Sequence, residues 1–291
     1  MELFFFAPAA SWPPTLLAAC FGLMIGSFLN VVIYRIPEMI RRESENAIAD
    51  YLEKDLPYPD EFSLITPNST CPKCGHKIRA WENIPVISYL FLRGKCSACK
   101  TPISLRYPAI ELLTGIVSAC LIWRFGSGIY GLATLVFTYL LISMTFIDLD
   151  HKLLPDDLNY LLLWSALLVN INHTFCSLND AVIGAAAGYM ALYSVNFIFA
   201  KLFKKQGMGN GDFKLLAALG AWFGWMALPQ IILIASVTGI LGFGLTSIFG
   251  KKAEGGEIPF GPSLSLAGIF VLLFGQRITE WTSFLLSSGA N

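Results

Sequence analysis

The sequence predicts an all-α polytopic membrane protein, with about eight transmembrane helices and a small insert on the cytoplasmic side. Composition is the first observation: of 291 residues, 55% are hydrophobic and 14% are charged. An ordinary globular domain has roughly 45–50% apolar and about 25% charged residues. The second observation is that the apolar residues form separate stretches of spanning length. The third is that the basic residues gather on one side of those stretches.

Taken in chain order, the apolar stretches give the candidate spans. We expect these at residues 13–36, 108–124, 128–147, 157–172, 180–203, 213–226, 229–249 and 262–282. A bilayer core about 30 Å thick needs about 20 helical residues to cross it. The first stretch exceeds the length of a signal-peptide core and no Lys or Arg precedes it, so we expect a retained helix. The stretch 213–226 is short, which favours a tilted or partly re-entrant helix.

The distribution of Lys and Arg sets the expected orientation. If the N-terminus is outside, all of the 20 Lys and Arg residues except Arg124 and Arg277 lie in inner loops. Inner loops are the basic ones in bacterial membrane proteins. We therefore expect a multi-pass protein with eight spans and both termini outside. A formal net charge of zero gives no basic surface for nucleic acid.

Four of the seven cysteines form two pairs in the insert, residues 37–107. The pairs are Cys71-Pro-Lys-Cys74 and Cys96-Ser-Ala-Cys99, and each can direct two thiolates at one ion. Four thiolates without an open position predict a structural Zn²⁺ site, so we expect the insert to be a zinc-binding domain. Two redox pairs or unpaired thiols are the alternative, although a reducing cytoplasm favours metal over disulfides.

Two aspartates are the strongest catalytic candidates. Asp148 ends the third expected span and Asp212 begins the sixth, so two complete crossings separate them and both reach the inner face. A carboxylate at membrane depth is costly and is a functional candidate by default. Asp212 could instead be a helix N-cap, and Asp156 or Asp157 looks like the cap of the fourth span.

Paired aspartates can divide acid and base roles in hydrolysis. One, when ionised, activates water, and the other, when protonated, donates to the carbonyl oxygen or the leaving amine. Helix dipoles favour negative charge on Asp212 over Asp148, but which residue is the base stays open. A membrane scaffold and a transporter are the rival classes. A scaffold needs the aspartates only as caps, and a transporter would show matching halves.

These motifs together resemble the bacterial type IV prepilin peptidases, membrane aspartic peptidases of the GxGD class. The resemblance covers nearly the whole chain. It rests on residues 22–37 (GLMIGSFLNVVIYRIP), the two cysteine pairs, 104–108 (SLRYP), 111–113 (ELL), the segment around Asp148, 209–212 (GNGD) and 258–262 (IPFGP). It implies a first transmembrane helix at 1–36, the zinc-binding domain at 37–107, and a peptidase core of about seven helices at 108–291.

The resemblance also implies an activity. Such enzymes remove a basic leader after a glycine from type IV prepilins and from the pseudopilins of type II secretion, at the cytoplasmic membrane face. Many also N-methylate the new terminus, with S-adenosyl-L-methionine as donor. The family's catalytic aspartates fall on Asp148 and Asp212, and Gly94 is a methylation-linked candidate. We expect five further residues to support the site: Gly209, Gly211, Asp150, Asp156 and Lys214.

Overall fold

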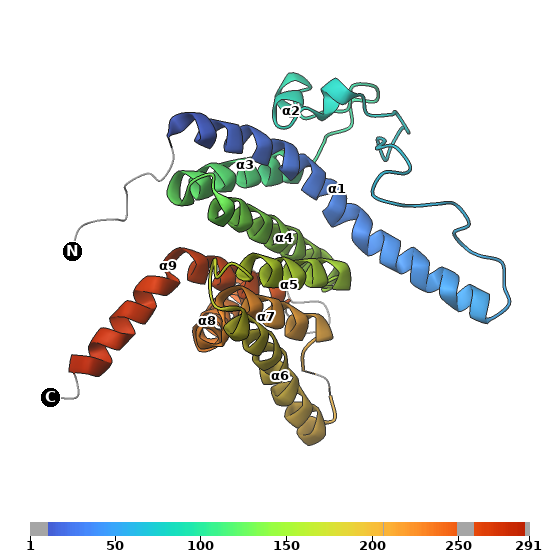
Figure 1. Cartoon of the computed structure of the whole chain (residues 1–291). Coiled ribbons are helices and arrows are strands. Elements are labelled where there is room, and N and C mark those ends of the chain that lie inside the picture. Colours follow the sequence, from blue (N-terminus) through green and yellow to red (C-terminus); the bar gives the residue numbers. More distant parts are fainter. Residues whose placement is uncertain (1–10, 206, 249–258, 289–291) are drawn as a thin grey trace. The chain divides into compact units, whose positions relative to one another are not determined.

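The computed structural model describes residues 11–205, 207–248 and 259–288, and these form helices joined by turns, with no strand (Figure 1). The predicted all-α class is therefore confirmed for this part of the chain. The two predicted periplasmic ends, 1–10 and 289–291, lie outside the described residues, as does Ile258. The chain divides into two compact units, Met1–Tyr139 and Leu140–Asn291, and the boundary falls inside helix α4 (Ile129–His151).

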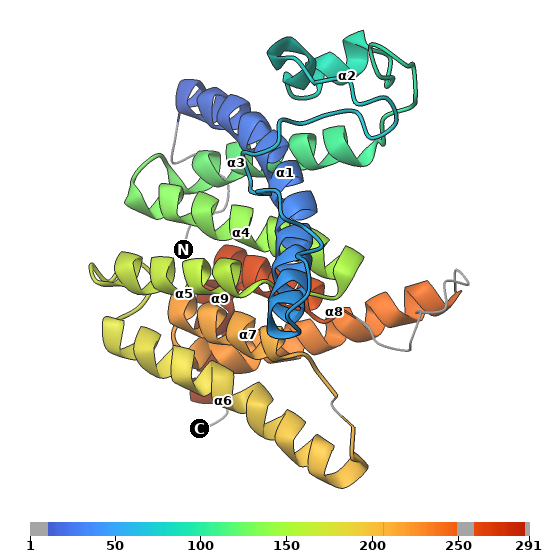
Figure 2. The same cartoon turned by 90° about the vertical axis from the view of Figure 1, so that its right-hand side faces the viewer.

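In the first unit, α1 (Trp12–Tyr51) packs along α3 (Arg106–Phe125), and the two helices lie side by side in both views (Figures 1 and 2). Glycines on α1 set the close approach. A Cβ on Gly22 would lie 2.7 Å from Ser118 Cβ, and one on Gly26 would lie 2.7 Å from Glu111 Cα. Small residues at such contacts let helix backbones approach closely within a membrane.

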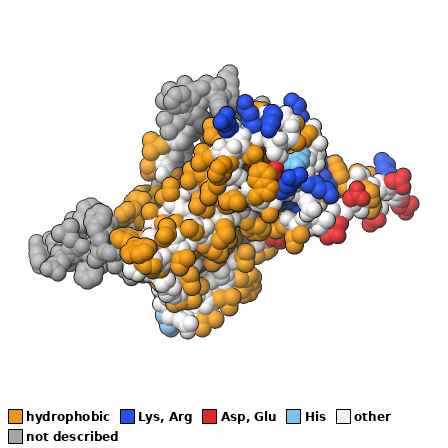
Figure 3. All heavy atoms as spheres, turned by 90° about the horizontal axis from the view of Figure 1, so that it is seen from above, with side chains coloured by type: hydrophobic (Ala, Val, Ile, Leu, Met, Phe, Trp, Pro, Cys, Tyr) orange, Lys and Arg blue, Asp and Glu red, His pale blue; other side chains and the backbone are white. Residues whose placement is uncertain are grey.

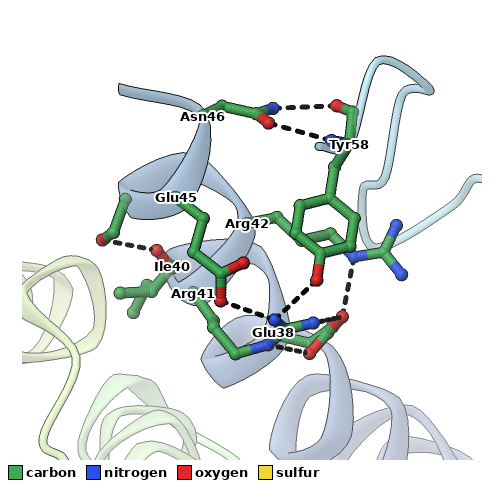
Figure 4. A network of polar contacts seen from close by, with 8 residues as sticks. Glu38, Ile40, Arg41, Arg42, Glu45, Asn46 and Tyr58 are labelled. Atoms are coloured by element: carbon green, nitrogen blue, oxygen red, sulfur yellow. Dashed lines mark hydrogen bonds and ion pairs between the residues drawn. The ribbon is translucent and has the colours of Figure 1, made fainter. Parts of the chain in front are cut away.

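Helix α1 continues 15 residues past the predicted end of the first span at residue 36 and contains Pro37. Proline removes one backbone hydrogen bond, but polar contacts hold the following turns together (Figure 4). Arg41 forms ion pairs with Glu38 and Glu45 at 2.7 Å, and the Asn46 side chain exchanges two hydrogen bonds with the backbone of Tyr58. The helix therefore carries the first span directly into the predicted insert.

Between α1 and α3 the insert has little regular structure. It contains the 3-10 helix η1 (Ala80–Asn83) and the short helix α2 (Ile87–Phe91). Arg35 fixes the start of this segment, because its guanidinium donates to the carbonyls of Ser63 and Pro67 at 2.8 and 2.6 Å. A buried arginine on α1 thus holds the polypeptide that leads to the first cysteine pair.

In the second unit the short helix α7 (Asn210–Phe223) is the core. It packs against α5 (Asp156–Asn170), α6 (Leu178–Phe203) and α9 (Gly261–Ser288), and α8 (Leu228–Ile248) packs on α9. Every residue of α7 from Asp212 to Trp222 is buried except Lys214. A helix buried in protein on nearly every side need not match the bilayer thickness, which explains how a segment of 14 residues suffices here.

Five helical segments of the described chain are long and apolar enough to cross a membrane. They are Trp12–Tyr51, Arg106–Phe125, Ile129–His151, Leu178–Phe203 and Trp225–Gly244. The predicted spans at 157–172, 213–226 and 262–282 correspond to α5, α7 and the apolar Gly261–Gly275, which are shorter. The expected count of eight is not confirmed. Hydrophobic side chains nevertheless cover much of the visible surface (Figure 3), as expected of a membrane protein.

Candidate active site and cysteine cluster

Asp148 lies in the last turn of α4 and is 5% exposed. Its Oδ2 accepts a hydrogen bond of 2.9 Å from the backbone N–H of Gly261, the first residue of α9. A Cβ on Gly261 would lie 2.6 Å from that oxygen, so only glycine brings the backbone this close. Sequence reasoning did not place Gly261 in the site, although its Pro-Phe-Gly-Pro context was a usable signal.

Asp212 lies in the first turn of α7 and is 8% exposed. Its Oδ1 is buried and has no hydrogen-bond partner among the described residues. The N-cap of α7 is Gly209, with no side-chain cap. By contrast, the cap of α6 is Ser177, whose hydroxyl accepts from Asp180 N–H at 3.1 Å. Asp212 is thus not the helix cap that the sequence allowed as an alternative.

The structure brings the two predicted catalytic aspartates together within the second unit. Their carboxylates lie near enough for their charges to interact. The Leu154 side chain packs between Gly211, which precedes Asp212, and Gly261, which donates to Asp148. A Cβ on Gly211 would lie 2.6 Å from Leu154 Cβ, and one on Gly261 would lie 3.0 Å from Leu154 Cδ2. Two buried carboxyl groups with one unpartnered oxygen form a site that can share a proton and hold a water molecule.

The residues predicted to support the site differ in their positions and contacts. Lys214 donates to Asp156 Oδ1 at 2.6 Å, which joins the N-terminal turns of α7 and α5. The expectation that Asp156 or Asp157 caps α5 was wrong, because Pro155 occupies the N-cap position and both aspartates lie in the first turn. Asp150 is exposed beyond Asp148.

The four insert cysteines form one cluster in the first unit, with all sulfur atoms within 4.8 Å of one another. Cys71 Sγ is 3.8 Å from Cys99 Sγ, and Cys74 Sγ is 4.0 Å from Cys96 Sγ. A tetrahedral ion with Zn–S bonds of about 2.3 Å separates its sulfurs by roughly 3.8 Å. The donor set and spacing therefore fit a metal ion of this kind.

Both cysteine pairs have the same backbone turn. Cys71 N–H donates to His76 O and Gly75 N–H to Cys71 O, while Cys96 N–H donates to Thr101 O and Lys100 N–H to Cys96 O. Backbone N–H groups of Lys73 and Cys74 lower the pKa of the Cys71 thiol, and hydrogen bonds with Thr101 lower that of Cys99 to about 6. Easily formed thiolates at these two positions suit metal binding, whereas burial and the neighbouring cysteines raise the pKa of the Cys74 thiol to about 11.

His76 connects the two cysteine turns without joining the cluster. Its Nε2 lies 3.2 Å from Glu82 Oε2 and 3.1 Å from Ser97 Oγ, and Ser97 belongs to the second turn. Gly94 precedes that turn with a positive φ of 63°. A Cβ there would lie 2.7 Å from the hydroxyl oxygen of Tyr89 in α2, so glycine is required for this packing.

Comparison with known proteins identifies two family models along the chain. The Bacterial Peptidase A24 N-terminal domain matches residues 20–125, which include the four insert cysteines, and the Type IV leader peptidase family matches residues 135–244, which include both aspartates. The chain belongs to the type IV leader peptidase family. No solved structure matches it.

Relatives from several bacteria share this family's sequence over almost their full length. A prepilin leader peptidase/N-methyltransferase of Aeromonas hydrophila is 50% identical, over 91% of this chain and 93% of its own. Proteins of the same name from Pseudomonas aeruginosa and Neisseria gonorrhoeae are 48% and 47% identical, over 89% and 93% of this chain and 90% and 94% of theirs.

Proposed function

We propose that this protein removes the leader peptide of type IV prepilins and pseudopilins by aspartate-dependent hydrolysis, and N-methylates the new terminus. Family membership and the relatives' names support both activities. The observation that carries the hydrolytic mechanism is the pair of buried carboxylates, Asp148 and Asp212, on helices distant in sequence. The same pair speaks against a scaffold in which these residues are helix caps.

Hydrogen bonding suggests how the pair divides its work. The Gly261 N–H stabilises negative charge on Asp148, whereas no described residue donates to the buried Oδ1 of Asp212. A hydrogen bond to the charged form favours that form, so the contacts favour Asp148 as base and Asp212 as acid. This is the reverse of the assignment that helix dipoles alone suggest.

The reaction then follows from these two roles. Asp148 takes a proton from water while the water oxygen attacks the scissile carbonyl carbon, and Asp212 donates its proton to the carbonyl oxygen. When the tetrahedral intermediate collapses, the C–N bond breaks, the leaving amine receives the proton held by Asp148, and Asp212 takes a proton from a hydroxyl of the intermediate as the new carboxylic acid forms. Both aspartates thereby return to their starting protonation states.

The substrate's position is consistent with this site. A prepilin carries a basic leader before an apolar helix, so its scissile bond lies at the membrane surface, and an inner-face site would cut after the leader's last glycine. The one-sided distribution of Lys and Arg supports a cytoplasmic active site in the bacterial inner membrane with both termini periplasmic. The bound peptide must be extended, because helical carbonyls are occupied by internal hydrogen bonds.

The metal ion and the methyl donor are both assigned to functions of the first unit. We assign the four-cysteine cluster a structural Zn²⁺, since its four thiolates leave no ligand position for substrate. S-adenosyl-L-methionine would supply an electrophilic methyl group for the second reaction. Gly94 acts there through packing, because it lets Tyr89 of α2 lie against the turn that begins the second cysteine pair.

Substitution of each aspartate tests the peptidase. Asp148→Asn and Asp212→Asn should each lower leader removal by about 100-fold or more, because a general acid or base contributes that much. Purified variants are incubated with a prepilin and the products are weighed by mass spectrometry. The exposed Asp157 gives the matched control, and Asp157→Asn should cleave normally. Normal cleavage by either site variant, in a protein that inserts in the membrane, would remove that residue from the mechanism.

A further inference from the structure

A third buried carboxylate lies outside the peptidase site. Among the described residues, the buried acidic side chains are Asp148, Asp212 and Glu111, and Glu111 is 8% exposed. It lies in the second turn of α3, where the helix leaves the cysteine-bearing insert. A buried charge is costly unless it is paired or fully hydrogen-bonded. The groups that contact Glu111 therefore indicate its function.

A hydrogen bond orients the Glu111 carboxylate and leaves it with acceptor capacity. Its Oε2 accepts the Val86 N–H at 2.7 Å. An ionised carboxylate offers about four acceptor positions. Within the part of the first unit that the structure describes, no Lys or Arg forms an ion pair with Glu111. The carboxylate therefore keeps acceptor positions for a cationic partner that no Lys or Arg of the described first unit fills by an ion pair.

The backbone at Val86 is strained to make this contact. Val86 has φ 60° and ψ −47°, and the Ile87 N–H turns back to the Pro85 carbonyl. A β-branched residue rarely adopts a positive φ. Strain of this kind persists only where the surrounding structure holds it, and it concentrates at functional sites. The bond from its N–H to Glu111 holds Val86 in place together with the bond that its carbonyl accepts from the Leu90 N–H.

Glu111 and Gly94 fix opposite ends of the same short helix. Val86 is the N-cap of α2, and Gly94, beyond its C-terminal end, packs against Tyr89 of that helix. Gly94 N–H also donates to Tyr89 O at 2.8 Å. The carboxylate, α2, Gly94 and the second cysteine turn therefore form one continuous structure, in which Gly94 is the methylation-linked candidate.

We propose that Glu111 binds the α-ammonium group of the processed pilin and holds its nitrogen for N-methylation. This inference rests on the proposed methyltransferase function. The ammonium first loses a proton to water, and the nitrogen lone pair then forms a bond to the methyl carbon of a sulfonium donor. The C–S bond breaks and its electron pair stays on sulfur. Nitrogen becomes positively charged during transfer, and a fixed carboxylate stabilises charge that develops there.

Glu111→Gln separates this role from a structural one. The amide oxygen can still accept the Val86 N–H, but the negative charge is lost. Binding is measured without methyl donor, using mature-pilin N-terminal peptides that carry either a free amine or an N-acetyl group. Wild type should prefer the free amine by about tenfold, and the variant should bind both peptides equally. Glu43→Gln, at an exposed position on α1, is the matched control and should keep the preference.

The second measurement follows both reactions of the full-length protein with intact prepilin. Glu111→Gln should remove the leader within about twofold of the wild-type rate and methylate at least about tenfold more slowly. Unchanged amine preference or methylation would overturn the proposal and leave Glu111 as a support for Val86. A parallel loss of cleavage would also overturn it. If the wild-type protein does not methylate, the proposed methyltransferase function fails, while the binding measurement still decides the role of Glu111.

Discussion

Among the described residues, one backbone hydrogen bond orients the Asp148 carboxylate. The Gly261 N–H reaches its Oδ2 at 2.9 Å, and the space between them admits no side-chain carbon. Any larger residue at position 261 must displace the carboxylate or the start of α9. Displacement of about 1 Å at a reacting group can lower a rate about 100-fold. Gly261 is therefore a positioning residue for Asp148.

At this scale we expect Gly261→Ala to lower leader removal by roughly 10- to 100-fold while the protein still folds. Initial cleavage rates and thermal unfolding of the purified variant give the two readouts. Gly242→Ala is the control, because a Cβ there meets no atom within 4 Å and alanine favours the interior of α8. A Gly261→Ala enzyme with the wild-type rate would show that this contact does not orient the base.

The two cysteine turns of the insert have the same backbone conformation and the same hydrogen-bond pattern. The fourth residue after the first cysteine of each pair has a positive φ: Gly75 at 70° and Lys100 at 60°. Glycine adopts this conformation without penalty, whereas another L-residue costs about 1–2 kcal/mol. The second turn therefore carries strain that the first turn avoids.

Opposite substitutions at these equivalent positions should have opposite effects. Gly75→Ala should destabilise its turn by about 1 kcal/mol although nothing lies within 4 Å of the added carbon. Lys100→Gly should stabilise the second turn by up to about 1 kcal/mol, less the loss of the bond from Lys100 Nζ to Ser97 O. Release of bound Zn²⁺ to a competing chelator measures both. Effects of the same sign would contradict the shared-turn explanation.

For the whole molecule, the two candidate chemistries belong to separate compact units. The cysteine cluster and Glu111 lie in the first, and Asp148, Asp212 and Gly261 lie in the second. No residue of the aspartate pair belongs to the cysteine-bearing insert. Loss of the metal should therefore affect the two reactions unequally.

Removal of Zn²⁺ by a chelator, or Cys71→Ser, should stop methylation and leave leader removal within about twofold. Product masses after incubation with a prepilin, with and without S-adenosyl-L-methionine, distinguish cleavage alone from cleavage with one added methyl group. Cys120→Ser, on α3 and outside the cluster, should leave both reactions unchanged. Equal loss of both reactions after chelation would show that the insert also supports the peptidase unit.

The sequence by itself determined the helical membrane class, the pairing of the four cysteines into one cluster and the two aspartates as candidates. These depend on composition, local spacing and the number of crossings between residues, which are properties of the linear chain. The predicted division at residues 36 and 107 stays a prediction, and α1 passes through the first boundary because polar contacts after Pro37 continue the helix.

Only the tertiary structure decided that Gly261 donates to Asp148, that Pro155 and Gly209 occupy the cap positions, and that Glu111 holds a strained Val86. Each depends on atoms from segments that are distant in sequence meeting at a few ångströms. Hydropathy likewise could not set the number of spans, because the short α7 is buried in protein on nearly every side. Apolar character reports that a helix avoids water, and packing decides whether lipid or protein covers it.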